Sequence, residues 1–146
     1  MRNSYKIFLV LLVFASCKKD ELITDDAPVI EFVSISPSSV IEYQDSITIT
    51  ISYKDANGDL GENDASVKNL FVTDSRNNVT YQYRIKQLSP DNSDISIQGN
   101  LNIVLANTAI IDDANATETL HYSVYIRDRA GNDSNTITTS DITVTK

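Results

Sequence analysis

Tryptophan is absent from this chain of 146 residues, which contains one cysteine, one histidine, four glycines and three prolines. A single cysteine excludes disulfide bonds within the chain. One cysteine and one histidine also exclude zinc sites that are built from several such ligands. The length and the 41% hydrophobic content suit one domain with its own core.

Positive charge is scarce, because 12 Lys and Arg stand against 20 Asp and Glu and the formal net charge is −8. Nucleic acids are bound through clusters of Lys and Arg, so we expect no nucleic-acid partner. The chain also lacks a Gly-x-Ser-x-Gly elbow, a phosphate loop and a dinucleotide fingerprint. These absences predict a protein that is not an enzyme.

An export signal opens the sequence. Arg2 and Lys6 precede an apolar run over residues 7–15, and the small residues Ala15 and Ser16 lead to Cys17. The run is about half as long as the ~20 residues that cross a bilayer as a helix. It therefore predicts a cleaved signal peptide over residues 1–16 rather than a membrane span.

Residues 13–17, Val-Phe-Ala-Ser-Cys, resemble the lipobox of bacterial lipoproteins, with Phe14 where leucine is commonest. The resemblance implies that Cys17 becomes the acylated first residue of a protein anchored in the outer membrane. Two or three acyl chains give stable anchoring, because each buried CH₂ contributes ~0.8 kcal/mol. A plain signal peptide with a cysteine at the cleavage point is the alternative.

Residues 17–27 combine the lipidated Cys17 with a predicted flexible linker that ends before Pro28. Residues 18–21, Lys-Lys-Asp-Glu, resemble the surface-export signal of some Gram-negative lipoproteins, which implies an anchor that faces outward. The alternative is a generic polar tether, so a periplasmic and an outward-facing anchor both stay open.

Residues 28–146 predict one all-β domain, because apolar and polar residues alternate at period two. The predicted strands cover residues 29–35, 46–54, 67–74, 79–87, 95–105, 119–127 and 135–144. Gly99 predicts a bulge or a close approach of two segments, and residues 139–141 predict a bulge. Residues 106–118 predict a long crossover or one short helical turn.

Seven strands with one apolar face each predict an antiparallel β-sandwich. The pattern, including residues 128–132 before the last strand, resembles immunoglobulin-like and cadherin-like modules of bacterial surfaces. In such a sandwich the loop after the second strand and the loop before the last strand emerge at the same end.

These two loops carry the one candidate site. Asp55, Asn57 and Asp59 alternate as in the Asp-x-Asn-x-Asp core of many calcium loops, and Asp128 and Asp133 stand in the second loop. Oxygen ligands of this kind suit Ca²⁺, so the five residues predict a calcium site. Turn formation alone is the alternative, because Asn, Asp and Gly favour turns and because Arg127 and Arg129 can pair with the carboxylates.

Other chemistry-bearing side chains are assigned to packing. His121 is predicted to be a surface or partly packed residue. Four tyrosines are predicted to face the core, and two to be exposed: Tyr53, Tyr81, Tyr83 and Tyr122 in the core; Tyr43 and Tyr125 at the surface.

The sequence therefore predicts a lipid-anchored, non-enzymatic cell-envelope protein that acts as a surface binding or adhesion-type module. The loops at 55–64 and 128–133 are its expected presenting end, with calcium as a candidate stabiliser. An accessory subunit of an outer-membrane complex is the first alternative. A glycan-binding uptake accessory is the second, so the partner is an unidentified protein or glycan.

Overall fold

The computed structural model of this chain describes residues 26–146. The predicted signal, Cys17 and the linker up to residue 25 lie outside the described residues. Within the described part the chain forms strands and no helix. The strands are β1 (Val29–Ser36), β2 (Ser39–Ile41), β3 (Ile47–Asp55), β4 (Leu70–Asp74), β5 (Thr80–Tyr83), β6 (Ile97–Leu105), β7 (Thr117–Leu120), β8 (Tyr122–Ile126), β9 (Ile137–Thr138) and β10 (Ile142–Thr145).

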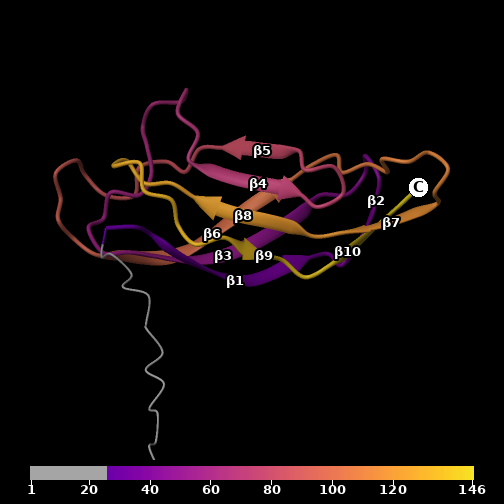
Figure 1. Cartoon of the computed structure of the whole chain (residues 1–146), viewed down its shortest axis with the longest axis horizontal. Coiled ribbons are helices and arrows are strands. Elements are labelled where there is room, and N and C mark those ends of the chain that lie inside the picture. Colours follow the sequence, from indigo (N-terminus) through magenta and orange to yellow (C-terminus); the bar gives the residue numbers. More distant parts are fainter. Residues whose placement is uncertain (1–25) are drawn as a thin grey trace, which may run out of the picture.

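The strands form two layers (Figure 1), and this confirms the predicted β-sandwich. One layer has the order β1-β3-β6, and the other contains β5-β4-β8-β9 and continues as β2-β10-β7. Apart from the parallel pair of β10 and β2, all pairs are antiparallel. This order is immunoglobulin-like, because β1, β3 and β6 occupy the places of strands A, B and E, which share one sheet in that fold.

The alternation in the sequence explains the core. Ile47, Ile49 and Ile51 of β3 are fully buried, while Thr48 and Thr50 between them are half-buried on the outer face. The opposite layer contributes Val72, Val124 and Ile126 to the same hydrophobic cluster. The members of this cluster extend from Ile30 to Val144, so strands from both ends of the described segment share one core.

Each of the two irregularities predicted from the sequence, at residues 139–141 and at Gly99, corresponds to a feature of the structure. Residues 139–141 separate β9 from β10, and the chain changes there from pairing with β8 to pairing with β7 and β2. Gly99 makes no bulge, since β3 and β6 pair in unbroken register. It allows a close approach instead, because a Cβ at Gly99 would lie 3.0 Å from the Tyr53 hydroxyl oxygen.

One sequence expectation is met and another fails in detail. Residues 106–116 form the crossover to β7, one of the two alternatives for this segment, and a single turn closes there as the Asn115 amide donates to the Asp112 carbonyl at 2.9 Å. Tyr81, expected in the core, is 41% exposed because it lies on β5, a four-residue strand at the sheet edge. Tyr53 and Tyr83 are half-buried and Tyr122 is fully buried, as their positions predicted.

Candidate functional site

The loop after β3 and the loop after β8 meet at one end of the sandwich, at the left in Figure 1. Leu60 and Asp128 form an isolated antiparallel bridge between them. The Arg129 amide also donates to the Asp59 carbonyl at 3.2 Å. This confirms that the two loops share an end, which we call the loop-pair end (residues 55–61 and 127–134).

Asp55 is the last residue of β3 and organises the first loop. Its side chain is buried, with one oxygen accepting from the Leu60 amide at 2.7 Å and the other from the Gly58 amide at 3.3 Å. Because both oxygens are used by the backbone, Asp55 holds the turn that brings Leu60 into the core.

Asp128 performs the same task in the second loop. One of its oxygens accepts from the Asn132 amide at 2.7 Å, and the other accepts from the Asn132 side-chain amide at 2.9 Å. The residue is only 6% exposed. The sequence pattern identified Asp55 and Asp128 because the residue types that close turns are also those that bind calcium.

Asp59 lies between these two carboxylates and differs from them. Its Oδ2 accepts from the Ala130 amide at 3.3 Å, while its Oδ1 is buried and has no hydrogen-bond partner. Burial raises the pKa of Asp59, and the negative charges of Asp128 and Asp55 raise it further. Among the predicted calcium ligands, Asp59 therefore has an acceptor atom that the protein leaves unsatisfied.

The other two predicted ligands are engaged elsewhere. The Asn57 side chain accepts from the Asp59 amide at 3.4 Å within its own turn. Asp133 forms a two-pronged pair with Arg127, at 2.6 and 2.8 Å, and this hydrogen bond lowers the pKa of Asp133. The structure thus gathers Asp55, Asp59 and Asp128 and leaves Asp133 outside the group.

Within residues 26–146 no three Asp, Glu, His or Cys side chains are arranged as ligands of one metal ion. The Arg129 guanidinium stands beside the group, donating to the Gly61 carbonyl at 3.0 Å. The calcium site therefore stays a prediction that depends on Asp59 and on movement of its neighbours.

A shallow depression at this end includes residues that the sequence analysis missed. Asp91 and Asp94, from the loop before β6, line it together with Asn57, Asp59 and Arg129. The Arg129 side chain approaches Asp91 at 3.8 Å. The run Pro90-Asp91-Asn92-Ser93-Asp94 signalled a turn, but nothing in the sequence placed that turn beside Asp59.

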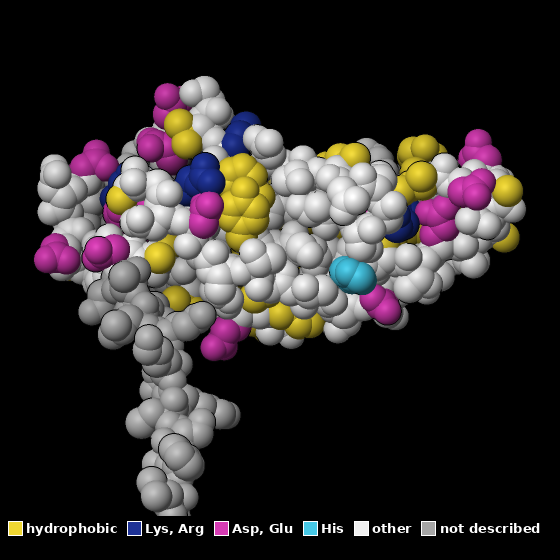
Figure 2. Space-filling model, viewed as in Figure 1, with side chains coloured by type: hydrophobic (Ala, Val, Ile, Leu, Met, Phe, Trp, Pro, Cys, Tyr) yellow, Lys and Arg dark blue, Asp and Glu magenta, His cyan; other side chains and the backbone are white. Residues whose placement is uncertain are grey.

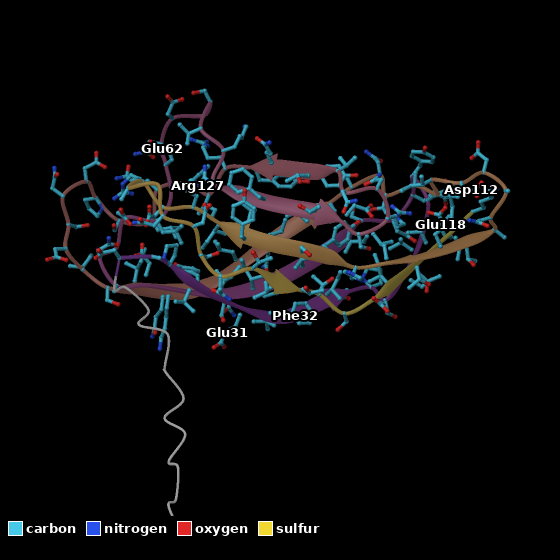
Figure 3. The ribbon with its side chains drawn as sticks, viewed as in Figure 1. Glu31, Phe32, Glu62, Asp112, Glu118 and Arg127 are labelled. Carbon is cyan, nitrogen blue, oxygen red and sulfur yellow. The ribbon has the colours of Figure 1, made fainter. Side chains whose placement is uncertain are left out.

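The exposed face of β4 and β8 carries an aromatic pair near Arg127 (Figure 3). The rings of Phe71 and Tyr125 stack at 4.5 Å between centroids, and the Arg127 guanidinium lies 5.5 Å from the Phe71 ring. Phe71 is only 9% exposed and Tyr125 is half-buried, so packing covers part of both rings.

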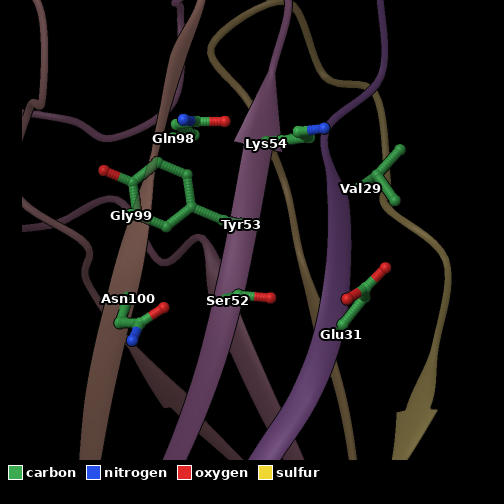
Figure 4. Close-up of a pocket in the computed structure, with 8 residues that line it drawn as sticks. All are labelled: Val29, Glu31, Ser52, Tyr53, Lys54, Gln98, Gly99 and Asn100. Atoms are coloured by element: carbon green, nitrogen blue, oxygen red, sulfur yellow. The ribbon is translucent and has the colours of Figure 1, made fainter.

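A second depression lies on the outer face of β1, β3 and β6 (Figure 4). Polar side chains from three adjacent strands line it, among them Glu31, Ser52, Lys54 and Asn100. Adjacent positions in the register explain this grouping, because Glu31 pairs with Ser52 and Ser52 with Asn100.

The opposite end, which we call the far end, consists of residues 41–46, 106–116 and Lys146. The chain there is held by Arg76, which donates to Asp74 at 2.8 Å and to Glu118 at 2.7 Å. Glu118 also accepts from the amides of Asp112 and Ile111, and these bonds lower its pKa to about 2. Figure 3 shows Asp112 and Glu118 at this end, remote from Arg127.

Comparison with known proteins gives no relative: no family model matches the chain, and no curated protein or solved structure matches it either. Residues 26–146 also contain no helix that is long and apolar enough to span a membrane.

Proposed function

We propose that this chain is a lipid-anchored, non-enzymatic binding module of the bacterial cell envelope. The anchor is Cys17, at the end of a signal that resembles a lipobox. Eight residues lie between Cys17 and Asp26, and the chain from one to the other reaches at most ~30 Å. The sandwich therefore stays close to the membrane that holds the lipid.

The observation that supports an orientation is the position of Asp26. Its carbonyl accepts from the side-chain amide of Asn132 at 3.2 Å, so the chain enters the sandwich at the loop-pair end. An anchor attached there keeps the loop-pair end near the membrane. The far end then points away from the membrane, which reverses the orientation expected from the loop sequences.

The far end has the character of a contact surface. Tyr43 is 67% exposed and Ile111 is 48% exposed, and Tyr43 adopts a left-handed backbone with φ of 58°. The Tyr43 amide donates to Thr108 at 3.3 Å, which joins the two segments into one tip. Figure 2 shows apolar atoms between acidic ones at this end. A contiguous apolar patch with a polar rim is typical of protein-binding surfaces, and we assign Tyr43 and Ile111 to such a patch.

Calcium has a more limited place in this proposal. We assign it to the loop-pair end, where Asp59 has the free acceptor and where Asp91 and Asp94 add negative charge. Binding there stiffens the membrane-facing loops, because an ion that neutralises Asp59 removes its repulsion with Asp55 and Asp128.

The test uses the full chain, expressed in a Gram-negative bacterium with a photo-crosslinking residue at one of two exposed positions. Tyr43 probes the far end, and Ala130, exposed on the loop-pair end, is the matched control. We expect discrete protein or glycan adducts from position 43 and lipid or no adducts from position 130. Adducts of a protein partner from position 130 alone would contradict the proposed orientation.

An accessory subunit of an outer-membrane complex is the second candidate, and the same exposed residues Tyr43 and Ile111 favour it. A subunit stays associated with its complex after extraction in mild detergent. A free binding module instead migrates as a small species, since the chain has a mass of only 16.2 kDa even before its signal is removed. Native gel mass after extraction separates the two candidates.

A further inference from the structure

Strand β6 is an open edge. It lies at the border of the β1-β3-β6 sheet and pairs with β3 over nine consecutive residues. Within the described part of the chain, the backbone of β6 makes no hydrogen bond to any segment other than β3. Alternate N–H and C=O groups of an antiparallel strand point away from its partner, so the outer row of β6 is free.

This edge lacks the features by which proteins protect sheet borders. The nine residues Ile97–Leu105 include no charged residue and no proline. The register with β3 runs without a bulge. Lysines, prolines, bulges and short strands are the usual protections of an edge. A long, uncharged and regular edge is a surface for strand addition.

The other edges of the sandwich are protected. On β1 the register shifts between Phe32 and Ser34, which interrupts the strand. The Asn135 side chain then caps the same edge, accepting from the Ile30 amide and donating to the Ile30 carbonyl, both at 2.9 Å. The remaining edge strands are short: β5 and β7 have four residues each, β2 has three and β9 has two. The contrast makes β6 the open border of this fold among residues 26–146.

We propose that β6 pairs antiparallel with β6 of a second copy of this chain. Leu101 is the central residue of the strand, so a twofold axis through it places Leu101 opposite its own copy. Ile97 then faces Leu105 of the other copy, and Gly99 faces Ile103. Ile97 and Leu101 are only partly buried in one copy although they point toward the core, and this pairing covers them.

The outer face is equally self-complementary in this register. Asn100 faces Asn102 of the second copy, and their side-chain amides supply both donors and acceptors. Gln98 faces Val104, which is 57% exposed in the single chain. In this register no like charges face each other. The two three-stranded sheets join into a single six-stranded sheet. A twofold axis closes the assembly as a dimer, because each copy uses its β6 edge once. In this register the loop-pair end of one copy lies beside the far end of the other. The two lipid anchors of the dimer therefore lie at opposite ends, and the orientation proposed above holds for the unpaired chain.

The test is sedimentation velocity on the chain from Lys18 onward, which keeps the whole described core and omits Cys17. From about 5 to about 500 µM, a monomer–dimer equilibrium is expected. Asn100→Glu with Asn102→Glu places acids opposite one another on the outer face, where both side chains are exposed in the monomer. This variant raises the dimer dissociation constant by about tenfold or more.

Two further variants control the result. The lysine variant, Asn100→Lys with Asn102→Lys, is expected to be monomeric when it is measured by itself. An equimolar mixture of the lysine and glutamate variants restores a dimer, which contains one copy of each. Ser34→Glu places a charge on the protected β1 edge and leaves the equilibrium unchanged. Amide hydrogen exchange of alternate β6 residues slows as the dimer forms.

A chain that stays monomeric over the whole range overturns the proposal, even if the edge accepts a strand from another protein. A dimer that persists in the glutamate variant also overturns it, since that dimer uses another surface. Unfolding midpoints of all variants at the lowest concentration show that each one is folded.

Discussion

Leu60 and Asp128 lie opposite each other as a single antiparallel bridge that joins the loop after β3 to the loop after β8. Leu60 is fully buried, and Asp128 next to it uses both of its oxygens to hold Asn132. The bridge fixes the two loops as one unit. It also brings Asp59 between Asp55 and Asp128, where its negative charge is unfavourable.

Asp59→Asn is expected to stabilise the protein. The pKa of Asp59 is raised in the folded state, so folding favours its protonated form, and its contribution to stability falls as the pH rises through the folded pKa. At neutral pH the substitution removes this unfavourable charge, a gain of about 0.5 kcal/mol after solvent screening. Asp133→Asn is the matched control and lowers stability, because the Arg127 hydrogen bond depresses the pKa of Asp133.

The same pair of variants tests calcium. Ca²⁺ at about 100 times its dissociation constant adds ~2.7 kcal/mol to the folded state, which is a shift of several degrees in the unfolding midpoint. We expect this shift in the unsubstituted protein and in Asp133→Asn, and not in Asp59→Asn. A midpoint that is identical with millimolar calcium and with chelator assigns Asp55, Asp59 and Asp128 to turn formation alone.

Gly61→Ala and Gly131→Ala form a second matched pair at the loop-pair end. Both glycines have left-handed backbones, with φ of 91° and 92°. A Cβ at Gly61 would lie 2.3 Å from the Lys86 carbonyl oxygen, whereas a Cβ at Gly131 meets nothing within 4 Å. We expect costs of about 3 kcal/mol for Gly61→Ala and about 1 kcal/mol for Gly131→Ala in urea unfolding. Equal costs would show that the loop at Gly61 is not packed as described.

Glu118→Gln tests the clamp that holds the crossover at the far end. The folded pKa of Glu118 is about 2, against an ordinary value of 4.5. Its contribution to stability is therefore fully present above pH 4.5 and is lost as the pH falls toward 2. Glu118→Gln is expected to lower the unfolding midpoint by several degrees at pH 7. Between pH 5 and 2, the unfolding midpoint of Glu118→Gln changes less than that of the unsubstituted protein. If the midpoints of the two proteins fall in parallel with pH, the Glu118 carboxylate does not stabilise the crossover.

Alternation in the sequence predicts the fold well because burial on one face imposes period two. Ile47, Ile49 and Ile51 are buried as their parity requires, and the predicted strands overlap every strand of the structure except β2. The pattern misses β2, whose three residues are too short to alternate, and it misplaces Tyr81, since parity does not show which strands lie at an edge.

Only part of the candidate site can be predicted from the sequence, because local spacing does not show which loops meet in space. Local spacing identifies Asp55 and Asp59, and the sandwich order brings Asp128 to the same end. The sequence also assigns Asp133 to this group, but in the structure Arg127 pairs with Asp133 and holds it on the exposed surface. Asp91 and Asp94 come from a third loop, and their position beside Asp59 depends on the path between β5 and β6.

The proposed attachment of this sandwich to a membrane through Cys17 can be tested by the mass of the mature protein. The full chain, expressed in a Gram-negative bacterium and purified from the membrane fraction, is analysed by intact mass and by N-terminal peptide mass. We predict a chain that begins at an acylated Cys17, and a Cys17→Ser variant that lacks the lipid and no longer fractionates as a lipoprotein. An unmodified Cys17, or cleavage elsewhere with release of the protein in soluble form, would contradict anchoring through Cys17.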